Sequence, residues 1–238
     1  VTKAITSTPI GGDYLNEKAA DLIVCPGEDA FIPGELIKQK SAVPLTEPPK
    51  YLKKESVNPS DSFLAFSKWS VLKEFKENIG QVAEVNGLAE KELSIRPPKY
   101  FEFPCGFNQN VGKDRFALGE YLFTGNRDAM EPGIVGLLAE STSKLLQVDP
   151  TASSLLNNLI VSGGTSLMSG FMERLSTEVQ TSMGGRTKVQ AMSTAQERKL
   201  TPWLGGSILA SLGTMQSFWL TRSEYDDHGP SVLSKKFL

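Results

Sequence analysis

Apolar residues between positions 63 and 84 follow the period of an α-helix. They recur every three or four residues and therefore share one face. Lys76 lies inside this apolar stripe, where a lysine is costly unless its ammonium meets an anion or reaches water along its flexible stem. From its position in the stripe alone, we expect the Lys76 side chain to extend to water. The stripe consists of Trp69, Leu72, Phe75, Ile79 and Val82.

Residues 157–179, "NNLIVSGGTSLMSGFMERLSTEV", combine a short apolar run, two glycines with a threonine, and a second amphipathic run. The short run is typical of a strand that is buried on both faces. The sequence therefore predicts a strand, a tight turn and a helix in immediate succession. The apolar face of this helix comprises Phe171, Met172, Leu175 and Val179.

Strands and helices alternate elsewhere in the chain as well. We expect a strand, a Gly-Gly turn and a helix in residues 1–27, two short strands around a turn in 99–123, and a helix in 133–149. In the last third, Thr201 fits a helix N-cap and Pro202 fits the first helical position. This alternation predicts the α/β class.

Residues 28–62 interrupt the alternation. Their prolines, lysines and weak periodicity are typical of a surface insertion that is partly disordered. The lysines offer contacts to DNA or to an acidic partner, but a solvated loop is the interpretation that such a pattern favours. These lysines are Lys38, Lys40, Lys50, Lys53 and Lys54.

The composition is that of a globular protein, with 39% hydrophobic and 22% charged residues among 238. A formal net charge of −2 does not indicate direct binding to nucleic acid. Cys25 and Cys105 are far apart in sequence and His228 is the one histidine, so we expect no metal site. Unpaired thiols fit a cytosolic or nuclear compartment.

Two further features concern the ends of the chain. The uncharged window 203–221 is rich in Gly, Ser and Thr, which predicts a buried helix of a soluble protein rather than a membrane span. The sequence starts at Val1 without methionine or signal peptide, and we interpret it as a fragment.

The Gly-Gly-Thr turn is a candidate anion site. Gly163 and Gly164 let the backbone approach a ligand, and the helix that follows directs its amides towards it. The spacing of a P-loop or of a dinucleotide fingerprint is absent, so tight packing alone also explains the glycines. With one histidine and scattered carboxylates, we expect binding of a nucleotide rather than its transformation.

Several segments resemble actin and its relatives. Residues 157–179 resemble the adenosine-phosphate loop of that family, and 197–238, "ERKLTPWLGGSILASLGTMQSFWLTRSEYDDHGPSVLSKKFL", resembles the actin C-terminus. "KAITSTPIGGDYL" and "YFEFPCGFNQNVGKDRFALGEYLF" are similar to the nuclear actin-related protein 4 group. The resemblance covers nearly the whole chain except the insertion at 28–62.

The resemblance implies the second half of the duplicated, ribonuclease H-like actin fold. Residues 1–11 and 124–200 would form an inner subdomain, and 12–123 an outer subdomain that carries the insertion. Residues 201–238 would belong to the inner subdomain of the first half. The groups that position the attacking water in actin belong to that first half, so the resemblance implies no hydrolysis by this chain alone.

The implied ligand is ATP, with Mg²⁺ in the full-length protein. The implied contacts are a glycine near the ribose, a Lys-Glu pair at ribose and base, the loop at the phosphates, a residue against the base, and a lysine beside the adenine. Methionine replaces the tyrosine of actin against the base, where it can still pack on adenine. Gly12 would lie near the ribose, and Lys76 and Glu77 at the ribose and base. Gly163, Gly164 and Thr165 would form the loop at the phosphates, Met168 would pack against the base, and Lys199 would lie beside the adenine.

The resemblance also implies a partner groove for an amphipathic helix of a remodelling ATPase or scaffold subunit. It implies a non-catalytic scaffold subunit of nuclear chromatin remodelling and histone acetyltransferase complexes, with actin and nucleosomal histones as further partners and nucleic acid contacted only indirectly. The alternatives are a filament-forming cytoskeletal actin ATPase and, less closely, a sugar kinase or chaperone ATPase. The groove residues are Leu209, Leu212, Thr214 and Phe218.

Overall fold

The computed structural model describes residues 4–25, 29–45, 47–126, 129–183 and 187–236. Over these residues helices alternate with short strands, which confirms the α/β class. The helices are α1 (Gly12–Ala20), α2 (Asp61–Ile79), α3 (Glu90–Ile95), α4 (Arg115–Thr124), α5 (Ile134–Val148), α6 (Phe171–Ser182), α7 (Ala195–Ser211), α8 (Arg222–His228) and α9 (Ser231–Lys236). The strands are β1 (Ile37–Ser41), β2 (Lys50–Lys53), β3 (Lys99–Glu102), β4 (Asn108–Val111), β5 (Asn158–Val161) and β6 (Lys188–Ala191).

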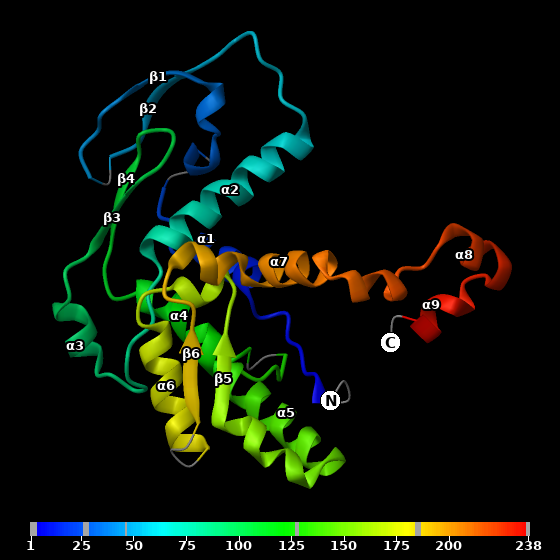
Figure 1. Cartoon of the computed structure of the whole chain (residues 1–238). Coiled ribbons are helices and arrows are strands. Elements are labelled where there is room, and N and C mark those ends of the chain that lie inside the picture. Colours follow the sequence, from blue (N-terminus) through cyan, green and yellow to red (C-terminus); the bar gives the residue numbers. More distant parts are fainter. Residues whose placement is uncertain (1–3, 26–28, 46, 127–128, 184–186, 237–238) are drawn as a thin grey trace.

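The first lobe packs α1 and α2 with two antiparallel hairpins, β1–β2 and β3–β4 (Figure 1). Its core is aromatic, because Phe75 of α2 meets Phe101, Phe103 and Phe107 of the second hairpin, all buried. The rings of Phe75 and Phe103 are stacked with their centroids 5.6 Å apart. Aromatic contacts add to the stabilisation that burial of apolar area gives, so this cluster holds the hairpin to the helix.

The predicted helices α1, α2 and α5 are confirmed, with boundaries shifted by a few residues. Residues 4–11 contain no strand, in contrast to the strand expected before α1. The segment 99–123 is a hairpin only as far as Val111, since α4 follows. Arg115 fixes the start of α4 by donating to the carbonyl oxygens of Val111 and Gly112. These local hydrogen bonds outweigh the tendency of the aromatic residues to form strands.

The insertion at 28–62 is more ordered than its sequence indicates over the residues that the structure describes. Strands β1 and β2 pair as an antiparallel hairpin. The Asn108 side chain donates to the carbonyl oxygen of Val43 at 2.9 Å, and the Tyr51 hydroxyl donates to Asp29 at 2.6 Å. These contacts join residues distant in sequence, and periodicity within the insertion cannot show them.

The second lobe contains the parallel pair β5–β6 with α5 and α6 (Figure 1). The predicted apolar face of α6 is confirmed: Phe171, Leu175 and Val179 are buried in the core and Met172 packs against it. The expectation for β5 is wrong, because one face of the strand is open to solvent and Ile160 is 75% exposed.

Helix α7 begins seven residues before Pro202, contrary to the expected start. Thr194 is the N-cap, and its side chain accepts from the Glu197 amide at 3.2 Å. A cap with a glutamate three residues later is a stronger start signal than Thr201 followed by proline. Pro202 therefore lies inside the helix and removes one backbone donor there.

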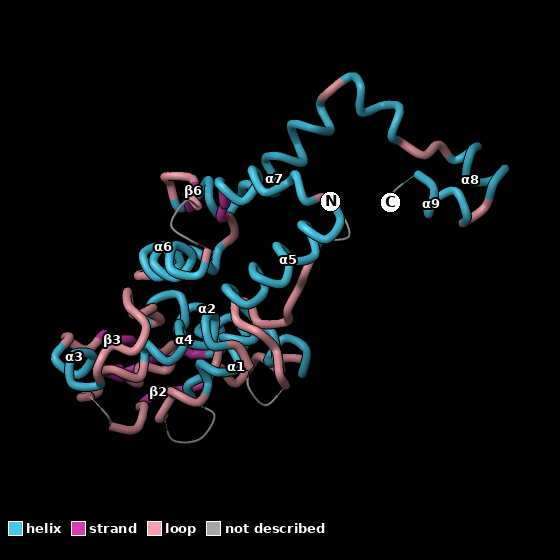
Figure 2. Tube along the Cα trace, turned by 90° about the horizontal axis from the view of Figure 1, so that it is seen from below, coloured by secondary structure: helices cyan, strands magenta, loops and turns pink. Residues whose placement is uncertain are grey.

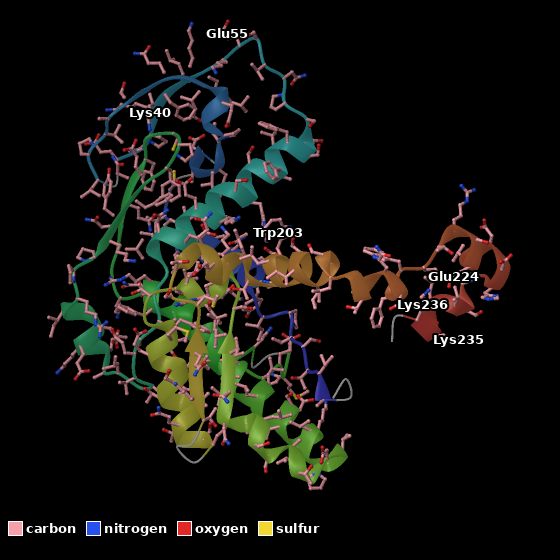
Figure 3. All side chains as sticks on the ribbon, viewed as in Figure 1. Lys40, Glu55, Trp203, Glu224, Lys235 and Lys236 are labelled. Carbon is pink, nitrogen blue, oxygen red and sulfur yellow. The ribbon has the colours of Figure 1, made fainter. Side chains whose placement is uncertain are left out.

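The second half of α7, together with α8 and α9, extends away from both lobes (Figures 1 and 2). The window 203–221 is largely exposed rather than buried as predicted, and Trp203 on α7 is surrounded by few other side chains (Figure 3). Glu224 of α8 and Lys236 of α9 form an ion pair that closes the end of this extension (Figure 3). None of the helices in the described ranges is long and apolar enough to cross a membrane.

Arg174 of α6 connects three segments in the interior. Its side chain is 1% exposed, and it donates two hydrogen bonds to Glu120 of α4, at 2.8 and 3.0 Å. It also donates to the carbonyl oxygen of Ala83 and to Glu178. Burial alone lowers the pKa of Arg174, but the bonds to Glu120 and Glu178 outweigh it and the net pKa is raised.

We predict that Arg174→Ala lowers the free energy of unfolding by about 3 kcal/mol, because it leaves carboxylates and a carbonyl without their donor. Arg96→Ala is the matched control, since Arg96 forms a similar bidentate pair with Glu84 at the surface. That change should cost less than about 1 kcal/mol. Urea unfolding followed by circular dichroism measures both, and equal losses would contradict a structural role for Arg174.

Candidate functional site

A cavity of about 660 Å³ lies between α1, α2, the turn after β5, and α7. These elements converge near the middle of the molecule (Figure 1). The structure places seven of the eight predicted nucleotide-binding residues around this one cavity, although they span 187 positions (199 − 12). The seven are Gly12, Lys76, Glu77, Gly164, Thr165, Met168 and Lys199.

Gly163 is the predicted residue that does not line the cavity, and it shapes the turn instead. Its φ of 99° lies in a region that other residues rarely adopt. Its carbonyl oxygen accepts from the hydroxyl of Ser166 at 2.7 Å, which closes the 3-10 helix Gly164–Leu167. Ser166 is buried. Ser166 was not predicted as a site residue, because its hydrogen bond to Gly163 depends on the shape of the turn.

Helix α7 holds the turn in place through Arg198. The amide of Gly163 donates to the Arg198 carbonyl oxygen at 2.9 Å. In a regular helix that oxygen would accept from residue 202, but Pro202 has no amide hydrogen. The Arg198 side chain also donates to the carbonyl oxygen of Ser166. Pro202 thus leaves a carbonyl free to bind the glycine turn, a role that the sequence did not reveal.

Lys76 does not extend to water as its spacing indicated. Its ammonium donates to the carbonyl oxygen of Gly12 at 2.9 Å. Burial lowers the pKa of Lys76, and the charges of Glu77 and Asp13 oppose this shift only in part. A side chain on Gly12 would lie 3.4 Å from the Lys76 ammonium and 3.5 Å from the Thr165 hydroxyl, so this glycine keeps the floor of the cavity open.

The other walls combine apolar and charged groups. Met168 packs over Gly80, where an added Cβ would lie 3.1 Å from its methyl group. Trp69 belongs to the predicted apolar stripe of α2, yet it is 37% exposed and lines the cavity together with Lys73. Neither Trp69 nor Lys73 was predicted as a site residue. For Trp69 the reason is that a tryptophan in an apolar stripe indicates a core position.

The cysteines lie far from this cavity in a different environment. Cys105 belongs to the aromatic core of the first lobe, and Cys25 packs against that core. Burial raises the pKa of Cys25 to about 12 and also raises that of Cys105, so both stay protonated near neutral pH. Within the described residues no cluster of His, Cys, Asp and Glu is arranged to hold a metal ion.

The predicted groove residues form a separate, exposed apolar surface. Leu209 lies in α7, Leu212 caps its end, and Thr214 and Phe218 lie in the 3-10 helix Gly213–Phe218. The three apolar side chains are 49 to 57% exposed. They do not line the cavity between α1, α2, the turn after β5 and α7. The structure therefore presents an accessible apolar surface at these positions, and its use stays a prediction.

Comparison with known protein families shows to which family the chain belongs. The family model described as Actin matches residues 1–238. The chain belongs to the actin family. This confirms the resemblance inferred from the glycine turn and from the C-terminal segment, and with it the actin-like α/β fold.

Relatives of the chain bear names that fit the narrower resemblance. It is 32% identical to "Actin-related protein 4" of Emericella nidulans, over 98% of this chain and 55% of that protein. It is also 32% identical to the protein of the same name from Yarrowia lipolytica, over 94% of this chain and 53% of the relative. Identity to the "SWI/SNF and RSC complexes subunit arp42" of Schizosaccharomyces pombe is 34%, over 96% and 58%. The chain spans about half the length of these relatives.

Proposed function

We propose that the cavity between α1, α2, the glycine turn and α7 binds ATP as a structural ligand. The observation that carries this proposal is the convergence of seven predicted residues, distant in sequence, on one cavity of about 660 Å³. That volume lies within the usual range of ligand sites, about 300–1,000 Å³. Mg²⁺ would accompany the nucleotide in the full-length protein.

The chemistry of the lining fits a nucleotide. Three cations, Lys73, Lys76 and Lys199, outnumber the carboxylates of Asp13 and Glu77, which favours an anionic ligand. Met168 and Trp69 supply apolar surface against which a base can pack. The Gly164 backbone is exposed at the turn, where no side chain blocks an approaching ligand.

We further propose that the protein is a non-catalytic scaffold subunit of nuclear chromatin remodelling or histone acetyltransferase complexes. The names of the relatives support a role of this kind, since one is called a SWI/SNF and RSC complexes subunit. The partner would be an amphipathic helix that packs on Leu209, Leu212, Thr214 and Phe218. Actin and nucleosomal histones are further proposed partners, and nucleic acid would be contacted through them.

The division into subdomains is part of the same proposal. Residues 1–11 and 124–200 form the inner subdomain, 12–123 the outer one, and 201–238 the segment that joins the other half. Helix α7 crosses the boundary at residue 200 without interruption, so it would physically connect the nucleotide cavity to the groove surface.

Lys76→Ala should weaken ATP binding by the full-length protein about ten- to hundredfold, because a hydrogen bond from a charged donor contributes about 1.5–3 kcal/mol. Isothermal titration calorimetry measures this change. Lys91→Ala, at an exposed position of α3, is the control and should bind like the unchanged protein. Equal affinity of the Lys76 variant and the control would count against the nucleotide assignment.

Leu212→Asp in the full-length protein should abolish co-purification with the scaffold helix and leave the fold intact. The Leu212 side chain is 49% exposed in this chain, and circular dichroism of the full-length variant checks that its fold is kept. Leu155→Asp changes an equally exposed leucine far from the groove surface and should keep the partner bound. Retained co-purification of the Leu212 variant would refute the groove.

Affinity purification from nuclear extract with mass spectrometry distinguishes the scaffold from the cytoskeletal alternative. We expect a remodelling ATPase, helicase-like subunits and acetyltransferase subunits. Recovery of filament-binding proteins and conventional actin, without those subunits, would instead support a filament-forming ATPase, and nucleotide hydrolysis would then be the next measurement.

A further inference from the structure

A second cavity, of about 460 Å³, lies between the insertion and the beginning of α2. Its walls come from residues 29–36, from the end of β2, and from residues 57–68. It shares no lining residue with the nucleotide cavity. Neither the family resemblance nor the proposed groove on α7 involves this part of the molecule.

The interior of the second cavity is apolar and open to water. Its apolar lining includes Phe31, Ile32, Leu36, Val57 and Leu64. Val57 is 45% exposed. Apolar surface that is concave and accessible gains free energy when a ligand side chain displaces its water.

Three lysines line this cavity around its apolar interior. Within the described ranges, Lys53, Lys54 and Lys68 have no carboxylate at ion-pair distance. Lys54 donates to a backbone carbonyl, that of Glu35, and Lys68 lies over the ring of Phe31 at 4.8 Å. Two other lysines of the same hairpin are paired, Lys40 with Glu102 and Lys50 with Glu47.

One carboxylate, that of Asp29, lines the cavity, but it is already engaged. It accepts a hydrogen bond from the Tyr51 hydroxyl at 2.6 Å. The lining thus carries three cations against one anion that is held by a neighbouring side chain. An incoming ligand therefore meets an excess of positive charge around an apolar centre.

Backbone contacts fix the shape of the cavity before any ligand binds. The amide of Lys54 donates to the Leu36 carbonyl oxygen at 2.9 Å, which joins the two ends of the hairpin. The Asn108 side chain anchors the hairpin loop to β4 through Val43. A preformed site avoids the entropic cost of ordering loops on binding.

We propose that this second cavity is the docking site of an acidic peptide segment of a partner protein. One apolar side chain of the peptide fills the interior, and its flanking Asp and Glu residues pair with Lys53, Lys54 and Lys68. Charge complementarity favours an acidic chain, and the apolar interior favours a peptide over nucleic acid, whose phosphates have no apolar group to place there.

Fluorescence anisotropy with the full-length protein tests this proposal. The labelled probes are peptides in which runs of Asp and Glu flank one central residue, either Phe, Leu or Ala. We expect the Phe or Leu peptide to bind and the Ala peptide to bind at least about tenfold more weakly, since Ala leaves most of the apolar interior in contact with water. Binding should weaken as salt is raised.

Charge-reversal variants locate the site. Lys53→Glu combined with Lys54→Glu should weaken the Phe peptide about tenfold or more, whereas Lys38→Glu, in the same hairpin but outside the cavity, should leave it unchanged. Val57→Glu should also abolish binding, and because Val57 is largely exposed, thermal unfolding should be unaffected.

Several results would overturn the proposal. These are absence of binding by the Phe and Leu peptides alike, equal binding of the Ala peptide, or an equal loss in the Lys38 variant. Preferential binding of duplex DNA that depends on Lys53 and Lys54 would assign the lysines to nucleic acid instead. ATP titration of the Lys53 and Lys54 variant, which should match the unchanged protein, keeps this test independent of the nucleotide proposal.

Discussion

The arrangement of the two lobes depends on the hydrogen bonds that the buried guanidinium of Arg174 donates. It joins α6 to α4 through Glu120 and to the chain after α2 through the carbonyl oxygen of Ala83. One residue before Ala83, the amide of Val82 donates to the Ser169 carbonyl oxygen at 2.8 Å. The end of α2 is therefore held directly against the segment that follows the glycine turn.

This contact sets the geometry of the nucleotide cavity. Gly170 has a φ of 84°, and an added Cβ would lie 2.1 Å from the Val82 carbonyl oxygen, so only glycine permits such an approach. The approach brings Met168 over Gly80, close to the last turn of α2 that carries Lys76. A buried ion pair costs free energy because both charges lose their water. Here the pair between Arg174 and Glu120 also positions the two walls of the proposed binding site.

The parts of the fold that the sequence predicts are those fixed by local periodicity. The stripe of α2, the face of α6 and the turn between β5 and α6 all depend on residues within one or two helical turns. The hairpin β1–β2 is missed because Asn108, distant in sequence, anchors it. Lys76 is misjudged for the same reason, since its acceptor, Gly12, is 64 positions away. The family resemblance identifies the cavity residues, whereas Ser166, Arg198 and Trp69 emerge only from the packing.

Helix α7 shares in both proposed sites. Its first half supplies Lys199 to the cavity and the Arg198 carbonyl oxygen to the turn, and its end carries Leu209 and Leu212. At 1.5 Å per residue, Lys199 and Leu212 are about 20 Å apart along the helix axis.

A nucleotide that contacts Lys199 would favour one position of α7 only if its contacts differ between alternative positions. Because the Gly163–Arg198 hydrogen bond ties α7 to the glycine turn, displacement of α7 would change the cavity itself. Occupancy of the cavity and binding of a helix at Leu212 would then influence each other to the same extent, as reciprocity requires.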